Sequence, residues 1–566
     1  MNLISRYKMQ VVRQLENHFN LDADRLAAVE LKLNVDKGAA FGDVTCNAAM
    51  VLAKVIGKNP RELAVEIKAL LEQPVDADSA LVDRVEIAGP GFLNIFFTHA
   101  AWARIACDLF MRERDNFVLS AEHKRMRYLL EYVSANPTGP LHFGHGRNGI
   151  IGDSLARILS FLGHEVTREF YINDAGKQVQ LLGASLKARC LQAAGKDVAL
   201  PEGGYAGDYL VELAQSCIQQ FGAGVVEKDD QFFSAYAKEH LLALIKEDLK
   251  AYGIEFDRWF SEKSLHDNGS VERSLDLLKD AGLLYEQEGA YWFKSSEFGD
   301  DKDRVIKKAN GELTYIAADI AYHKDKFDRG YDKIIDILGQ DHHGYVKRLK
   351  ATMQALGYDA QKLDVILYQL VSLKENEELV RMSKRAGTFT KLSDVIDAVG
   401  ADVTRFFFLN RKADAHLEFD LGVAMKKSDE NPVFYIHYAY VRTKSLLVRA
   451  AEHESFSSFI DLLERKDQAL CGSILSRMGE AEHALLKRIL FLADVLQNVA
   501  HNYQTHVLSY YTWELAYAFH TYYTNNRVID PEDQSTSQVR IFMVHVVQKT
   551  LDLCLDLLGL SKPERM

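Results

Sequence analysis

The sequence predicts a multidomain α/β protein with an open parallel sheet at its centre, a small α+β module before it and an α-helical bundle after it. Three observations support this fold class. Residues 127–172 follow the order strand, tight loop, helix and strand, which is typical of a parallel sheet. Strand patterns return at residues 333–370, after a long helical stretch. From about residue 430 onward, apolar residues recur almost entirely at helical spacing.

Composition places the chain among globular proteins. Its 566 residues are enough for about three or four domains, with 48% hydrophobic and 26% charged residues. No apolar run reaches the ~18 residues of a membrane helix, and the first residues lack a secretory signal, so we expect a cytoplasmic protein with no membrane contact. The net charge of −12 disfavours nucleic-acid binding, except through locally basic faces.

The six cysteines include no CxxC pair. Neither a disulfide framework nor a cysteine zinc site is therefore indicated, and we expect no bound zinc. Nine prolines and the lack of a low-complexity tract argue against long disordered linkers.

Residues 1–108 form the predicted N-terminal module. Met1–Phe19 has an amphipathic helical pattern, and the alanine-rich segment Asn47–Ile56 predicts a second helix. Pro60 suits the first turn of a third helix. Val85–Phe97 contains two apolar runs around Ala-Gly-Pro-Gly, which predicts a β-hairpin.

The central domain begins near residue 109 and contains the most informative stretch of the chain. Arg127–Val133 is an apolar run that predicts a buried parallel strand. Ser134–Pro140 cannot continue it, because two prolines and a glycine interrupt the pattern. From His142 the spacing is helical up to Gly163, a typical helix end. In an open α/β sheet, such a unit binds its ligand at the carboxyl end of the strand.

His142 and His145 lie three residues apart, on one face of the first turn of this helix. Gly144 between them lets a ligand approach the backbone. Imidazole N–H groups beside the free backbone N–H groups of a helix N-terminus suit a phosphate. Alone, the pair would more often be two surface histidines near a turn, but the flanking strand, loop and helix favour a phosphate site.

The rest of the chain predicts an insertion, a return to the sheet and a helical end. Residues 180–300 are expected to be mostly helical, with mixed charges typical of a solvated surface. Further strands are expected at Lys333–Leu338 and Val365–Leu370. The tyrosine-rich residues 430–566 predict an α-helical bundle. Most of these aromatic residues are expected in its core, and a few could stack on unpaired bases.

These motifs resemble those of class I aminoacyl-tRNA synthetases. His142-Phe143-Gly144-His145 is similar to their HIGH signature, and Arg381–Arg385 (RMSKR) is similar to their KMSKS element. The string SANPTGPLHFGHGRN at Ser134–Asn148 resembles the arginyl-tRNA synthetase family in particular. Similar segments extend over nearly the whole chain, including FGDVTCNAAMVLAK, AGPGFLNIFF, YINDAGKQ, GYAGDY and the closing PERM.

The resemblance implies a division into domains and a set of partners. Residues 1–108 would contact the elbow of the tRNA. Residues 109–392 would form a Rossmann-like catalytic domain with a helical insertion at about 180–300. Residues 393–429 would contact the stem, and residues 430–566 would bind the anticodon. The partners implied are tRNA-Arg, L-arginine and ATP, with the chain acting as a monomer.

The implied reaction is ATP-dependent arginine–tRNA ligation. The carboxylate of L-arginine attacks the α-phosphorus of ATP, pyrophosphate leaves, and arginyl-adenylate passes its arginyl group to the 3′-terminal adenosine of tRNA-Arg. By resemblance, arginine activation itself needs the tRNA. Mg²⁺ is expected with ATP, held mainly by phosphate and water rather than by a protein metal site. The resemblance assigns catalysis to His142, His145 and Lys384, and ATP binding to His142, Gly144, His145, Met382, Ser383 and Lys384.

Arginine needs a carboxylate in fixed geometry, because a guanidinium pairs with it bidentately and lysine cannot. Tyr315 and Asp319 lie four residues apart and so share a helix face. By resemblance, Asp319 holds the guanidinium with Tyr315 beside it, and Glu131 holds a charged end of the amino acid. The complete set of arginine-binding residues that the resemblance implies is Glu131, Ser134, Asn136, Tyr315, Asp319 and Gln340, with Ser134 and Asn136 at the α-amino and carboxylate groups.

The RMSKR segment departs from KMSKS at two positions. Arg381 replaces lysine, which keeps the charge but changes its geometry and leaves the role of this residue open. Arg385 replaces serine. Because Lys384 is retained, we expect an active enzyme. Ser383 and Gly387 suit a mobile loop whose closure could gate the reaction.

Four other functions fit the sequence less well. A non-catalytic RNA-binding relative would be expected to lose His142, His145 or Lys384. A small-molecule nucleotidyltransferase with an HxGH site needs neither the N-terminal module nor the helical end. A dehydrogenase would use a strand–GxGxxG–helix unit; Gly144–Gly149 has this glycine spacing, but it lies within the SANPTGPLHFGHGRN string that resembles the synthetases. Another class I synthetase specificity remains open in principle, but Tyr315 and Asp319 favour arginine.

Overall fold

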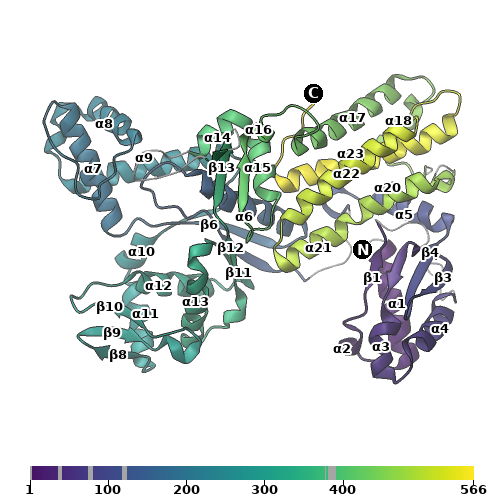
Figure 1. The fold of residues 1–566 in the computed structure, drawn as a ribbon, viewed down its shortest axis with the longest axis horizontal. Helices are drawn as coiled ribbons and strands as arrows, with labels where there is room; N and C mark the ends of the chain where they lie inside the picture. Colours follow the sequence, from purple (N-terminus) through teal and green to yellow (C-terminus); the bar gives the residue numbers. More distant parts are fainter. Residues whose placement is uncertain are drawn as a thin grey trace.

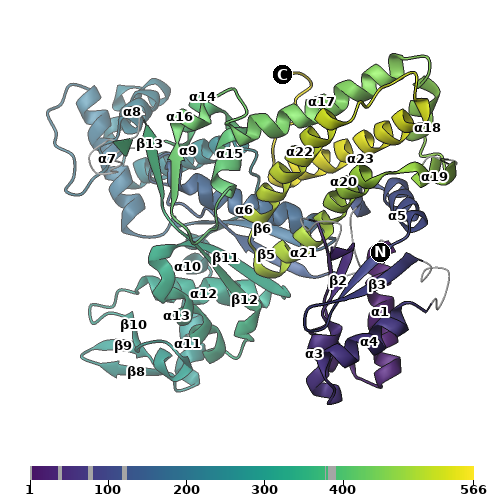
Figure 2. The ribbon, with the colours of Figure 1, turned by 45° about the vertical axis from the view of Figure 1, so that its right-hand side comes forward.

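The computed structural model describes most of the chain, in the ranges 3–35, 41–73, 81–117, 124–375, 378–379, 391–468, 470–473 and 475–566. Its N-terminal module lies next to the C-terminal helices, and helices α7 (Lys177–Ala193), α8 (Asp208–Phe221) and α9 (Asp230–Ala251) project from the other side of the central sheet (Figure 1). Figure 2 shows the same arrangement after a turn of 45°. Among the residues described, no helix is both long and apolar enough to span a membrane.

The N-terminal module packs helices on a four-stranded antiparallel sheet of order β1-β2-β4-β3. The predicted hairpin at its edge is confirmed, with Gly89 and Gly91 in the turn at φ of 54° and 146°. The predicted third helix begins at Pro60, and the Asn59 side chain caps it by accepting from the Arg61 N–H. The elements are α1 (Leu3–Phe19), α2 (Ala23–Leu26), β1 (Leu31–Leu33), β2 (Val44–Cys46), α3 (Ala48–Ile56), α4 (Pro60–Leu71), β3 (Val82–Ala88), β4 (Phe92–Phe97) and the linking helix α5 (His99–Met111).

The central sheet is five-stranded and entirely parallel, in the order β12-β11-β5-β6-β7. The chain continues from β5 to β6 on one side, and β11 lies on the other, so the topology reverses between β5 and β11. A ligand site is expected at the carboxyl ends of these two strands. The predicted strands are confirmed within a few residues: β5 (Arg127–Glu131), β6 (Glu165–Ile172), β11 (Lys333–Gly339) and β12 (Leu363–Tyr368). The fifth strand, β7 (Arg258–Ser261), was not predicted.

Residues 180–300 are less helical than the sequence predicts. Besides helices they contain β7 of the main sheet and most of a small antiparallel sheet of order β10-β9-β8. Glu288 and Gly289, at φ of 54° and 74°, form a tight turn between two strands too short to show a period. The elements are α7 (Lys177–Ala193), α8 (Asp208–Phe221), α9 (Asp230–Ala251), α10 (Glu262–Asp267), α11 (Ser270–Asp280), β8 (Leu284–Gln287), β9 (Ala290–Phe293) and β10 (Arg304–Lys307).

Two helices cover the site region, and a further small sheet of order β14-β13-β15 follows β12. Helix α6 (Phe143–Phe161) connects β5 to β6, and α12 (Tyr315–Asp328) precedes β11. The other elements of this part are α13 (His343–Ala355), β13 (Val371–Glu375), β14 (Glu378–Leu379), α14 (Leu392–Val399), α15 (Ala401–Leu409), β15 (Leu417–Asp420) and α16 (Leu421–Ala424).

The C-terminal region is helical, as predicted, and is anchored to the central domain by a buried cation. Arg405 is 1% exposed and donates to the backbone oxygens of Tyr252 and Leu558 and to the carboxylate of Asp153. The helices are α17 (Pro432–Glu452), α18 (Ser457–Glu464), α19 (Leu470–Ser473), α20 (Glu480–Leu490), α21 (Leu492–Asn502), α22 (His506–Asn525) and α23 (Gln534–Leu558).

One disulfide joins Cys107 of α5 to Cys471 of α19, with the two Cα atoms 5.2 Å apart. The cysteine spacing gives no sign of it, because the two residues are 364 positions apart and meet only when α5 packs against the C-terminal helices. The sequence, which shows no sign of a disulfide framework, does not predict this single bond.

Candidate active site

The loop after β5 begins with a strained turn. Val133 and Ser134 have φ of 66° and 42°, a conformation that a β-branched residue such as valine rarely adopts. The buried amide of Asn148, on α6, accepts from the Val133 N–H at 2.7 Å and donates to the Ile337 oxygen of β11 at 2.9 Å. The turn is thus held from two neighbouring elements, and it ends the strand before the predicted Val133.

His142 and His145 both stand at the N-terminus of α6, as the sequence predicts. The Nδ1 atom of His142 accepts from the Gly144 N–H at 2.9 Å, and the Nδ1 atom of His145 accepts from the His142 N–H at 3.1 Å. A Cβ atom on Gly144 would lie 3.2 Å from the His142 Nδ1 atom, so the glycine keeps this cap compact. A neutral imidazole that accepts at Nδ1 carries its proton on Nε2, which makes Nε2 a donor.

A pocket of about 380 Å³ opens at the carboxyl ends of β5 and β11. Four carboxylates line it: Glu131 from the end of β5, Asp336 from β11, Asp319 from α12 and Glu262 from the start of α10. Tyrosine rings complete much of the wall, namely Tyr171, Tyr315, Tyr322 and Tyr345. An acidic, aromatic-lined pocket suits a planar cation such as a guanidinium.

Asp319 is the carboxylate most affected by this environment. Burial raises its pKa to about 7; His323 acts against the rise, whereas Glu262 and Glu131 add to it. The Tyr345 hydroxyl donates to Asp319 Oδ2. Burial also raises the pKa of Glu262. A bound cation would lower the pKa of both carboxyl groups, so the pocket favours a positively charged ligand.

Glu131 is held on both of its oxygens. The Ser134 hydroxyl donates to Oε1 at 2.8 Å, and the buried ammonium of Lys326 donates to Oε2. Ser134 Oγ also accepts from the Tyr171 N–H at 3.1 Å. The predicted residues Glu131, Ser134, Tyr315 and Asp319 are therefore brought together, although Tyr315 is 75% exposed at the pocket rim.

Two predicted arginine-binding residues lie elsewhere. Asn136 is exposed and donates to Gln178 at 2.9 Å. Gln340 lines a separate hollow with His343, while its neighbour His342 lines the acidic pocket. The predicted residues of the RMSKR segment lie at 380–390, outside the described residues: Arg381, Met382, Ser383, Lys384, Arg385 and Gly387.

Sequence reasoning missed Glu262, Tyr345 and Lys326. Glu262 directly follows β7, so its position at a strand end would have marked it if β7 had been recognised as part of the main sheet. Lys326 lies seven residues after Asp319, on the same face of α12. Among the residues described, no group of three or more His, Cys, Asp or Glu side chains could hold a metal ion.

Comparison with known families matches three parts of the chain. Residues 109–406 match the family described as tRNA synthetases class I (R), catalytic domain. Residues 436–566 match the DALR anticodon binding domain, and residues 7–97 match the arginyl tRNA synthetase N terminal domain.

Relatives and solved structures agree with these matches. An arginine–tRNA ligase of Citrifermentans bemidjiense is 42% identical over 544 residues, covering 94% of this chain and 95% of that protein. One from Geobacillus thermodenitrificans is 40% identical over 574 residues, covering 100% of both. The structure of Thermus thermophilus arginyl-tRNA synthetase shares the fold with a TM-score of 0.75 at 21% identity, covering 99% of this chain and 100% of that one.

Proposed function

The chain belongs to the arginyl-tRNA synthetase family of class I synthetases, and we infer from this membership that it is an arginine–tRNA ligase. It uses ATP to convert L-arginine to arginyl-adenylate, and it transfers the arginyl group to the 3′-terminal adenosine of tRNA-Arg. The observation in the structure that best supports this function is the acidic pocket at the carboxyl ends of β5 and β11.

In our proposal, the two cationic groups of arginine meet different carboxylates. Asp319 pairs bidentately with the guanidinium, while the Tyr345 hydroxyl fixes one of its oxygens and Glu262 faces the same cation. Glu131 accepts from the α-ammonium group, because Ser134 already orients this carboxylate at the strand end. Lysine would lose the bidentate pairing at Asp319, which accounts for selectivity.

The ATP site is proposed at the N-terminus of α6, with HFGH as the HIGH motif and RMSKR as the KMSKS motif. The Nε2–H groups of His142 and His145 and the helix N-terminus stabilise charge on the α-phosphate. A carboxylate oxygen of arginine bonds to the α-phosphorus while the bond to the bridging oxygen of pyrophosphate breaks. The Lys384 ammonium stays in contact with the departing phosphates, and Mg²⁺ bound by ATP offsets their charge.

The tRNA is proposed to contact three parts of the chain: residues 1–108 at the elbow, 393–429 at the stem and 430–566 at the anticodon. Exposed aromatic side chains on α22 support the last of these. Trp513 and Tyr517 are 40% and 54% exposed, and their rings are stacked with centroids 5.7 Å apart. Such rings suit stacking on unpaired bases.

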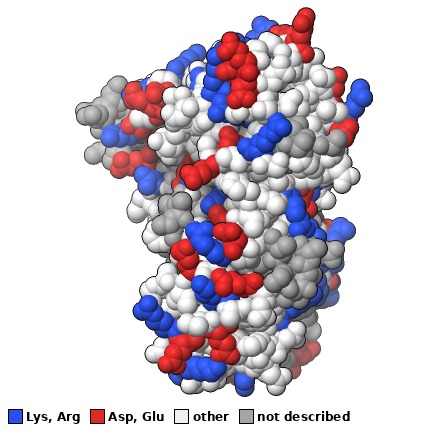
Figure 3. Space-filling view, turned by 90° about the vertical axis from the view of Figure 1, so that its right-hand side faces the viewer, with Lys and Arg blue, Asp and Glu red and all other residues white. Residues whose placement is uncertain are grey.

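The surface charge favours local rather than long-range attraction to RNA. On the face shown in Figure 3, acidic and basic side chains alternate in small groups among larger uncharged areas of the residues drawn in colour. This pattern fits the net charge of −12. We expect the enzyme to act as a cytoplasmic monomer, as the family resemblance implies.

Aminoacylation of total tRNA with each of the twenty amino acids in turn tests the function. Arginine should be the amino acid attached, at a rate far above that of lysine. Efficient charging with another amino acid, or none with arginine, would contradict the proposal. A companion assay is ATP–pyrophosphate exchange, which should require tRNA; exchange at full rate without tRNA would contradict that expectation alone.

A further inference from the structure

Three carboxylates lie in a row across the central sheet. Glu131 of β5 is directly opposite Asp336 of β11 on one side and Glu169 of β6 on the other. Residues opposite each other in parallel strands point to the same face of the sheet, so these side chains all face α12. Glu131 is 7% exposed, Asp336 1% and Glu169 not exposed at all. Buried carboxylates in such a row repel one another unless cations separate them.

Helix α12 and the residue that directly follows it supply those cations. Arg329 donates to both oxygens of Glu169, at 2.6 and 3.0 Å. Lys326 has no exposed surface, and its ammonium donates to Asp336 Oδ1 at 2.6 Å and to Glu131 Oε2. Burial lowers the pKa of Lys326, but Asp336 and Glu131 outweigh burial and hold it above its ordinary value, so this ammonium stays charged.

Lys326 is not part of the pocket wall, and Glu131 is. The ammonium therefore reaches Glu131 from behind, on Oε2, while Ser134 donates to Oε1. Each carboxylate oxygen has two lone pairs, so Glu131 can still accept from a ligand in the pocket. Without Lys326, Glu131 would face the neighbouring carboxylate of Asp336 with no cation between them, and its orientation toward the pocket would be lost.

We propose that Lys326 is a positioning residue for substrate: its ammonium holds the Glu131 carboxylate in the place where it binds the α-ammonium group of arginine. This inference rests on the proposed function. Lys326 itself touches no substrate. Its removal should weaken recognition of the α-ammonium group and leave recognition of the guanidinium, at Asp319, intact.

Two ligands separate this role from a general structural one. L-arginine carries both cationic groups, whereas 5-guanidinopentanoate has the same guanidinium and carboxylate but no α-amino group. For the wild type, arginine should bind more tightly than 5-guanidinopentanoate. For Lys326→Met, arginine affinity should fall about tenfold, the size of one lost charge-assisted hydrogen bond, while 5-guanidinopentanoate affinity changes less than about twofold.

Matched variants keep the test decisive. Asp336→Asn retains the contact between Lys326 and Glu131 and should keep the preference for arginine. The double variant Lys326→Met/Asp336→Asn leaves one fewer unpaired charge than Lys326→Met. It should also lose the preference for arginine, so it can be tested in place of Lys326→Met if that single variant does not fold. Lys324→Met, on the outer side of α12, should leave both affinities unchanged, because Lys324 pairs with Asp328 instead.

The outcomes are distinguishable. An unchanged preference in folded Lys326→Met or in the double variant, or an equal weakening of both ligands, would overturn the positioning role. Failure of the wild type to bind arginine at all would instead overturn the proposed function.

Discussion

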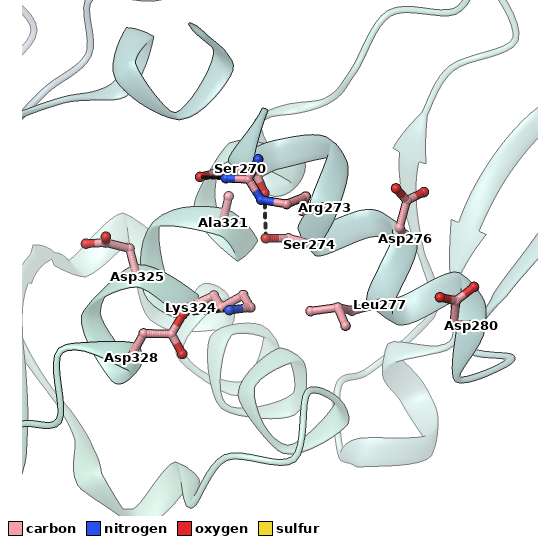
Figure 4. Close-up of a pocket in the computed structure, with 10 residues that line it drawn as sticks. All are labelled: Ser270, Arg273, Ser274, Asp276, Leu277, Asp280, Ala321, Lys324, Asp325 and Asp328. Carbon is pink, nitrogen blue, oxygen red and sulfur yellow. Dashed lines mark hydrogen bonds and ion pairs between the residues drawn. The ribbon is translucent and has the colours of Figure 1, made fainter. Parts of the chain in front are cut away.

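Two lysines on α12, two residues apart, occupy opposite environments. Lys326 is fully buried between Glu131 and Asp336 behind the acidic pocket. Lys324 lines a hollow of about 400 Å³ between α11 and α12, where its side chain is 25% exposed and pairs at 2.6 Å with Asp328, which is 49% exposed (Figure 4). Both lysines donate to carboxylates, so the difference between them is burial.

That difference determines which charges can influence function. An exposed ion pair contributes about 0–1 kcal/mol, because water solvates both partners almost as well. Removing one partner of a buried pair costs about 3–5 kcal/mol, because the other charge is left without water or counter-ion. The outer hollow is also rich in aspartate, including Asp276 and Asp280, but its carboxylates are not closely enclosed by aromatic rings as those of the acidic pocket are.

The largest effect is expected at Asp319, on the pocket side of α12. Asp319→Asn removes the proposed partner of the guanidinium and should lower kcat/KM for arginine by about 10³-fold, since a buried charge pair is broken. The KM for ATP should stay within about twofold. ATP–pyrophosphate exchange in the presence of tRNA measures both. An arginine KM equal to that of the wild type would show that the guanidinium binds elsewhere.

His145 should show the next largest effect. His145→Ala should reduce the rate of adenylate formation by about 10²–10³-fold, because a donor to the developing phosphate charge is lost. Affinity for tRNA should not change, which a filter-binding assay can establish. His145→Asn serves as the control for helix capping, since its side-chain oxygen can still accept a backbone N–H; a normal rate in this variant would assign His145 a capping role alone.

The raised pKa of Asp319 predicts a pH dependence for arginine binding. The carboxyl must lose its proton to pair with the guanidinium, so affinity is full above a pH of about 7 and falls as the pH decreases through that value. Below it, the expected loss is about tenfold for each pH unit. Titration calorimetry from pH 5.5 to 8.5 measures the slope, and Asp319→Asn should abolish it. A flat profile in the wild type would exclude Asp319 as the titrating partner.

The smallest effect is expected on the outer side of α12. Lys324→Met removes the exposed pair with Asp328 and should change the free energy of unfolding by less than about 1 kcal/mol. Urea denaturation measures this change, with arginine KM as a second readout. A large loss of activity in this variant would mean that the outer hollow, rather than burial of the inner row, matters for function.

Much of the fold could be predicted from the sequence, because local residue patterns determine most of its helices and strands. The strand at Arg127 and the helix from Phe143 to Phe161 follow from periodicity, glycine and proline. The short strands β8 and β9 were missed because four residues are too few to show a period. The disulfide between Cys107 and Cys471 could not be found, because it depends on packing between distant helices.

The residues of the site likewise include some that the sequence could identify and some that it could not. Tyr315 and Asp319 could be selected because their spacing on one helix adds to the family resemblance. The row of Glu131, Glu169 and Asp336 can be recognised only when the strand order is known. No pattern along the chain therefore shows why α12 contains Lys326. The predicted roles of Lys384 and its neighbours remain predictions, because residues 380–390 are not described.

A structure of the protein with L-arginine and a non-hydrolysable ATP analogue tests the central claim most directly. We expect the guanidinium to lie within hydrogen-bond distance of Asp319, the α-ammonium group to contact Glu131 and the α-phosphate to lie beside His145. Arginine bound outside the acidic pocket, or an α-phosphate distant from the N-terminus of α6, would contradict the account.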